Sequence, residues 1–111
     1  MNTEFAIAIY RPHRGKERKV EELLKMHIPL LQREGLVTDK TAYILRSPID
    51  GTFLEIFEWI STEAAQKAHS HSEISLLWSE MSEIADFGTL SDLKEAGESF
   101  PRFHLFTSFE E

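Results

Sequence analysis

Hydrophobic positions recur along the chain with two spacings, every second residue in some segments and every third or fourth in others. The shorter repeat is typical of strands and the longer one of helices. Runs of branched and aromatic residues predict strands over Glu4–Arg11, Asp39–Ser47, Thr52–Ile60 and Arg102–Phe109. Helical spacing predicts a helix from about Arg14 to Glu34, a short one that Ser61 and Thr62 cap and that runs to about His69, and a third from about Ser70 to Ala85. The order β-α-β-β-α-α-β predicts an α+β fold, a ferredoxin-like sandwich whose antiparallel sheet carries its helices on one face.

Turn, proline and capping signals add detail to these elements. The run Pro48–Gly51 has the composition of a tight turn, so the strands on either side of it should form a hairpin. Pro29 lies inside the first helix and lacks a backbone N–H, so we expect a kink or an early end there. Ser70 followed by Glu73 is typical of a capping box at the start of the third helix. The segment Gly88–Pro101 is predicted to be a polar connection with a loose turn.

Both faces of the predicted strands are apolar. In the first strand one face carries Phe5, Ile7 and Ile9, and the other carries Ala6, Ala8 and Tyr10. Fully burying a large apolar side chain contributes about 1.5–3 kcal/mol, so half a dozen on the face without helices amount to roughly 10 kcal/mol, as much as a typical net folding stability. We therefore expect a second copy of the chain to cover that face, which gives a homodimer. The alternative is that the Gly88–Pro101 connection covers it.

Composition narrows the class of protein. The length of 111 residues predicts one domain over 1–111. The 12 lysines and arginines against 19 aspartates and glutamates give a formal charge of -7, which repels phosphate backbones, so no nucleic acid partner is expected. The chain has no cysteine, which excludes disulfides and thiolate metal sites. The sequence shows neither a signal peptide nor a long apolar run, so we expect a cytoplasmic protein with no membrane partner.

A few polar residues are candidates for chemistry. His27 lies on the apolar stripe of the first helix, which is more typical of a hydrogen-bonded core histidine than of an active one. Glu55 and Glu58 point to opposite faces of the third strand, so they do not form a paired-carboxylate site within it, although either could lie in a pocket or at its rim. His69 and His71 do not converge on one face as they would in a strand, so we expect no metal site.

The run Glu58-Trp59-Ile60-Ser61-Thr62-Glu63-Ala64-Ala65-Gln66-Lys67-Ala68-His69 joins a strand that ends in tryptophan to a capped helix with alanines and a histidine. With this run, the element order and the two-faced strands, the chain resembles the antibiotic biosynthesis monooxygenase family over almost its whole length. Members of that family are dimeric α+β barrels, in which two sheets face each other and a pocket lies between each sheet and its own helices. The resemblance therefore implies the same dimer here.

The oxygenases of that family act on polycyclic phenols without a metal or flavin. Their pocket favours the deprotonated form of an electron-rich aromatic molecule, and the anion passes an electron to oxygen. The resemblance implies a cofactor-independent monooxygenase for a small apolar aromatic substrate. It makes Tyr10, Tyr43, Trp59 and Trp78 the expected lining of the pocket, and His69 the expected catalytic base or hydrogen-bond partner, because histidine titrates near neutral pH.

The same fold carries several reactions and also proteins with none, so other functions stay open. Haem-degrading members use an asparagine on the first strand with a tryptophan and a histidine on the helical segment. Here Ala8 falls near the asparagine position and Ser79 near the histidine, which disfavours haem breakdown. One remaining alternative is a ligand-binding or sensing protein that has the pocket and no reaction. Another is an interaction module whose pocket is filled by its own side chains, and a cavity of roughly 300 Å³ or more would disfavour it.

Overall fold

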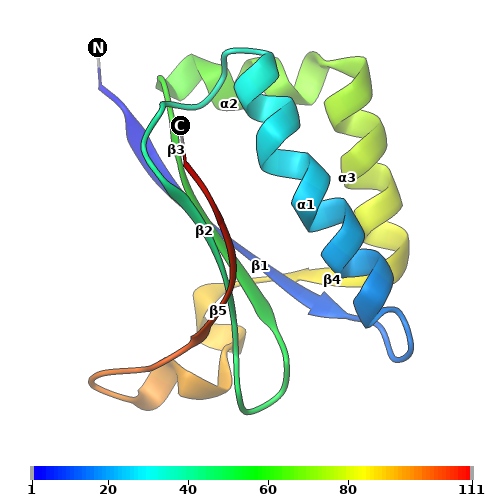
Figure 1. The fold of residues 1–111 in the computed structure, drawn as a ribbon, viewed down its shortest axis with the longest axis vertical. Coiled ribbons are helices and arrows are strands. Elements are labelled where there is room, and N and C mark those ends of the chain that lie inside the picture. The colour runs from blue at the N-terminus through cyan, green and yellow to red at the C-terminus, as the bar shows by residue number, and fades with distance from the viewer. Residues whose placement is uncertain (1, 111) are drawn as a thin grey trace.

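A computed structural model describes residues 2–110 of the chain. Its strands are β1 Glu4–Pro12, β2 Ala42–Arg46, β3 Phe53–Trp59, β4 Ala85–Gly88 and β5 His104–Phe109. Its helices are α1 Glu17–Arg33, α2 Thr62–Ser70 and α3 Ser72–Ile84, and two 3-10 turns, η1 Leu90–Asp92 and η2 Lys94–Gly97, lie between β4 and β5. Figure 1 shows the helices on one side of the sheet and the 3-10 turns on the other side, near the start of β5. Within residues 2–110, every helix is too short or too polar to span a lipid bilayer.

The five strands form one sheet in the order β4-β1-β3-β2-β5, and every neighbouring pair is antiparallel. The predicted α+β class, the antiparallel sheet and the helices on one face are confirmed, and the arrangement is compatible with a ferredoxin-like fold. The predicted hairpin between β2 and β3 is also present. The N–H of Ser47 donates to the carbonyl of Thr52 at 2.8 Å, and Gly51 adopts a φ of 78°, in the left-handed region that favours glycine.

One strand was not predicted, and another begins three residues later than expected. Ala85, expected at the end of the third helix, starts the short strand β4, which pairs with Ile9–Pro12 of β1. A strand of four residues is too short to show a two-residue repeat, which explains why the sequence did not predict it. The predicted strand from Asp39 begins only at Ala42, because the polar residues before it turn back on themselves, with the N–H of Lys40 donating to Thr38 Oγ1 at 3.3 Å.

Helix α1 runs through Pro29 to Arg33, so the early end expected at this proline is wrong. A proline inside a helix removes one backbone hydrogen bond, but packing of an apolar face supplies most of the stability of a helix in a protein. The buried face of α1 consists of Val20, Leu24, His27, Ile28 and Leu31. This stripe packs on the sheet on both sides of the proline, which keeps the helix continuous.

The starts of α2 and α3 show one expected cap and one unexpected cap. Ser61 caps α2 as predicted, with its Oγ accepting from the N–H of Ala64 at 3.2 Å. The capping box predicted from Ser70 is wrong, because Ser70 is the last residue of α2. Instead, His71 separates the two helices and its ring Nδ1 accepts from the N–H of Ile74. His71 is therefore both the C-cap of α2 and the N-cap of α3.

The sheet face away from the helices is partly covered. Leu93, from the connection between β4 and β5, packs on Ile9 and Leu54 of that face. The connection therefore covers part of the face, as one of the two alternatives predicted. Elsewhere on this face the exposed apolar side chains are Phe5, Ile7, Tyr43 and Leu105, with exposed fractions between 45% and 61%.

Candidate functional site

A cleft lies between the sheet and the helices on the side of β1 and β4. It has a volume of about 360 Å³ and is lined by Ala6, Ile7, Ala8, Ile9, Tyr10, His27, Phe57, Trp59, Trp78, Phe87 and Gly88. Ala6 and Ala8 pack toward the helices, and their short side chains leave room that larger residues would fill. Rings supply most of the remaining lining, so the cleft suits a flat apolar molecule of modest size.

Four polar side chains from four different elements form a continuous hydrogen-bonded chain beside this cleft. Tyr10 of β1 donates from Oη to Glu55 Oε1 at 2.7 Å. His27 of α1 lies with Nδ1 at 2.8 Å from Glu55 Oε2 and 3.0 Å from Oε1. Trp78 of α3 donates from Nε1 to His27 Nε2 at 2.9 Å. We call Tyr10, Glu55, His27 and Trp78 the buried network, since Glu55 is 0% and His27 3% exposed.

The hydrogen-bond pattern assigns the protons in this network. An indole N–H only donates, so His27 Nε2 is the acceptor and carries the lone pair of the ring. His27 Nδ1 then carries the proton and donates to Glu55, which also accepts from Tyr10. A carboxylate that orients an imidazole in this way leaves Nε2 as the basic atom, an arrangement that general-base catalysis uses.

The surroundings of Tyr10 keep it in the protonated form. Burial raises the pKa of its phenol well above the ordinary value, and the negative charge of Glu55 and the hydrogen bond to it raise the pKa further. Tyr10 is therefore a hydrogen-bond donor to Glu55 and not a base.

The structure brings together most of the residues that the sequence predicted for the site. Tyr10, Trp59 and Trp78 line the cleft. His69 is exposed and is not among the lining residues, but its ring packs edge-on against Trp78 with a centroid distance of 4.8 Å. Tyr43 lies on the opposite face of the sheet and is 45% exposed. The catalytic role expected of His69 stays a prediction.

His27 and Glu55 are the members of the site that the sequence did not single out as active. The interpretation of His27 as a buried, hydrogen-bonded histidine is confirmed. Glu55 shares the helix-facing side of β3 with Phe53 and Phe57, so its position already required a buried carboxylate with donors around it. That signal was present in the strand pattern. The identity of the donors depended on how α1 and α3 pack over the sheet.

Glu58 faces the other side of β3 and has a different role. It accepts from Thr3 and from Thr38 Oγ1 at 2.9 Å, and Lys40 Nζ lies 3.0 Å from its Oε1. The hydrogen bond from Thr3, followed by those from Lys40 and Thr38, lowers the pKa of Glu58. This cluster ties the segment before β1 and the segment before β2 to β3, and it lies outside the cleft.

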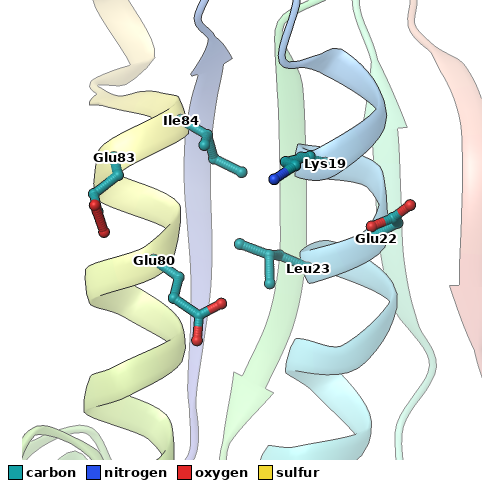
Figure 2. Close-up of a pocket in the computed structure, with 6 residues that line it drawn as sticks. All are labelled: Lys19, Glu22, Leu23, Glu80, Glu83 and Ile84. Carbon is teal, nitrogen blue, oxygen red and sulfur yellow. The ribbon is translucent and has the colours of Figure 1, made fainter.

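A second hollow of about 320 Å³ lies between α1 and α3 (Figure 2). Its six lining residues are Lys19, Glu22, Leu23, Glu80, Glu83 and Ile84. Four of them are charged surface side chains, and none belongs to the buried network. Among residues 2–110, no three histidine, aspartate or glutamate side chains are grouped so that they could hold a metal ion. The cleft beside the buried network is therefore the better candidate for chemistry.

Comparison of the sequence with models of protein families and with curated proteins finds no match.

Proposed function

We propose that the protein is a cofactor-independent monooxygenase that binds a small phenol in the cleft and uses His27, oriented by Glu55, as the base. One observation carries the proposal. His27 lines a mostly apolar, aromatic cleft, its Nε2 accepts a hydrogen bond from Trp78, and its Nδ1 is bonded to a fully buried carboxylate. The volume of about 360 Å³ suits a molecule of two fused rings. The resemblance to the antibiotic biosynthesis monooxygenase family supports the same chemistry.

In the proposed reaction, the proton of the substrate hydroxyl moves to His27 Nε2. The imidazolium that forms is stabilised by Glu55, while Tyr10 and the aromatic walls exclude water from the phenolate. The phenolate passes one electron to O₂, and the phenoxyl radical and superoxide then combine to form a C–O bond. The peroxide anion takes back the proton held by His27 and becomes a hydroperoxide. Loss of water from this hydroperoxide leaves a second carbonyl. One phenol and one O₂ thus give one quinone and one water.

We also propose that two copies pair through the exposed part of the sheet face away from the helices, to form the dimeric α+β barrel of that family. Phe5, Ile7, Tyr43 and Leu105 are each about half exposed there. Burying the exposed halves of four large apolar side chains would contribute about 3–6 kcal/mol per copy. An apolar patch of this kind is typical of an interface rather than of a monomer's surface.

The experiment is aerobic turnover of 1-naphthol, followed with an oxygen electrode and by the absorbance of 1,4-naphthoquinone. We expect equal amounts of oxygen consumed and quinone formed, and a loss of about 100-fold or more in kcat for His27→Ala, as is usual when a general base is removed. His104→Ala is the matched control, because it removes another histidine, on β5, that does not line the cleft. Equal rates for His27→Ala and the parent would overturn the assignment of the base.

The same experiment tests the two other roles that remain open. If His69→Ala loses activity as severely as His27→Ala, the catalytic role first expected of His69 is supported. If the parent binds 1-naphthol, measured by quenching of tryptophan fluorescence, and consumes no oxygen, the protein is a ligand-binding protein with the same cleft. The presence of the cleft itself favours both of these over an interaction module with a filled core.

A further inference from the structure

Trp78 donates a hydrogen bond to His27 Nε2, the atom that accepts the substrate proton in the proposed reaction. The lone pair of His27 Nε2 accepts the indole N–H of Trp78 at 2.9 Å. A neutral imidazole has one acceptor nitrogen with one lone pair, so Nε2 cannot take a proton from a substrate while this bond is in place. We propose that Trp78 is a gate on the base: a substrate hydroxyl displaces the indole N–H from His27, and only then does His27 act. This inference rests on the proposed function.

The exchange of partners suits the reaction. Trp78 lines the cleft beside His27, so its indole N–H remains next to the substrate oxygen after it has left Nε2. There it can donate to the oxygen that has just lost its proton, where negative charge develops. One hydrogen bond at His27 Nε2 before the exchange becomes two after it, one from the substrate hydroxyl to Nε2 and one from the indole N–H to the substrate oxygen. The gate therefore favours a ligand with a hydroxyl over an apolar ligand that only fills the cleft.

The exposed ring of His69 lies outside the cleft lining and packs against Trp78. Its ring packs edge-on against Trp78 at 4.8 Å with an interplanar angle of 68°, and His27 packs on Trp78 at 6.2 Å. Trp78 of α3 thus lies between a histidine of α2 and a histidine of α1. An edge-on aromatic pair contributes to the position of both rings. His69 is therefore a positioning residue that acts through Trp78.

Few groups face His27, so the reactivity of its Nε2 can be assigned to its bond with Trp78. Glu55 from β3 bonds Nδ1, and Tyr10 from β1 reaches His27 only through Glu55. Phe57, with its ring 6.1 Å away, and Trp78 carry no charge. The reactivity of Nε2 toward a small reagent therefore reports chiefly on whether the indole N–H occupies it.

The experiment measures acylation of His27 by diethyl pyrocarbonate, mapped by mass spectrometry, without substrate or turnover. Trp78→Phe keeps an aromatic ring and removes the N–H, and we expect His27 to react about tenfold faster, the factor that one hydrogen bond represents. Trp59→Phe is the matched control. It changes a tryptophan of the same cleft whose indole is not bonded to His27 Nε2, since that atom accepts from Trp78. An equal rate of acylation in Trp78→Phe and the parent would overturn the gate.

The role of His69 has its own pair of variants in the same assay. His69→Ala should raise the rate of acylation at His27, and His69→Phe, which restores an edge-on ring, should return it toward the parent. Equal rates in all three proteins would remove His69 from the gate.

A measurement on the parent protein covers the case in which Trp78→Phe does not fold. The chain has two tryptophans, so its ¹H–¹⁵N spectrum contains two indole signals. On addition of 1-naphthol, the Trp78 indole signal should shift as its N–H changes acceptor from His27 Nε2 to the oxygen of the ligand. A Trp78 signal that keeps its position while the ligand binds contradicts the gate. If neither signal moves, the proposed function fails, and the acylation rates still decide whether Trp78 blocks Nε2.

Discussion

Replacing Glu55 with leucine should destabilise the protein more than any other single change in the site. Glu55 is fully buried and accepts from Tyr10 at 2.7 Å and from His27 at 2.8 Å. Glu55→Leu leaves two buried donors without an acceptor, at about 1–3 kcal/mol each, so the free energy of unfolding should fall by roughly 2–6 kcal/mol. Glu55→Gln keeps an acceptor for one donor and a donor for the other, so it should cost only about 1–2 kcal/mol.

The assay is urea unfolding of the parent and the variants at one protein concentration, since association would add to the apparent stability. Tyr10→Phe removes one of the two stranded donors, so the double variant Tyr10→Phe/Glu55→Leu should be less destabilised than the sum of the two single variants by about 1–3 kcal/mol. Additive costs, or a Glu55→Leu protein within about 0.5 kcal/mol of the parent, would show that the buried network is not formed as described.

Four further predictions concern pH, assembly and the cleft. The raised pKa of Tyr10 means that its contribution to stability is complete below about pH 10 and is lost as pH rises through the raised value. Tyr10→Phe should therefore lose less stability than the parent as pH rises through that alkaline range, followed by circular dichroism, and parallel alkaline profiles contradict this. The lowered pKa of Glu58 means that its contribution is present above about pH 4.5 and is lost as pH falls through the lowered value; Glu58→Gln should lose less stability than the parent in that acid range, and parallel acid profiles would refute this. Ile7→Asp should sediment as a monomer at concentrations where the parent is a dimer, and a parent that is monomeric at micromolar concentration removes the proposed interface. Ala8→Phe should fill the cleft and weaken binding of 1-naphthol at least about tenfold, and unchanged binding would place the ligand elsewhere.

Hydrophobic spacing predicted most of the fold because each main element is long enough to repeat its pattern. The buried stripe of α1 and the cap at Ser61 are local features that the sequence contains in full. The strand β4 was missed because it is only four residues long and exists through its pairing with Ile9–Pro12. The continuation of α1 through Pro29 depends on packing against the sheet, which no local rule contains.

The candidate site was predicted less completely than the fold, because it depends on how separate elements pack together. Tyr10 and Trp78 were expected in the cleft because the family resemblance implies a pocket between sheet and helices that large aromatic residues could line, and both do line the cleft. His27 follows the apolar stripe of its helix, so its spacing alone does not distinguish a structural histidine from an active one. Only the packing of α1 and α3 over β3 shows that Glu55 bonds one side of His27 and Trp78 the other.

The most direct test of deprotonation in the cleft is the absorption spectrum of 1-naphthol bound to the protein without oxygen at neutral pH. The phenol and the phenolate absorb at different wavelengths, so the spectrum reports the proton on the bound ligand. We predict the phenolate in the parent protein and the neutral phenol in His27→Ala, with His104→Ala behaving as the parent. A bound ligand that keeps its proton in the parent, or a phenolate that persists without His27, would contradict the role proposed for the cleft and its base.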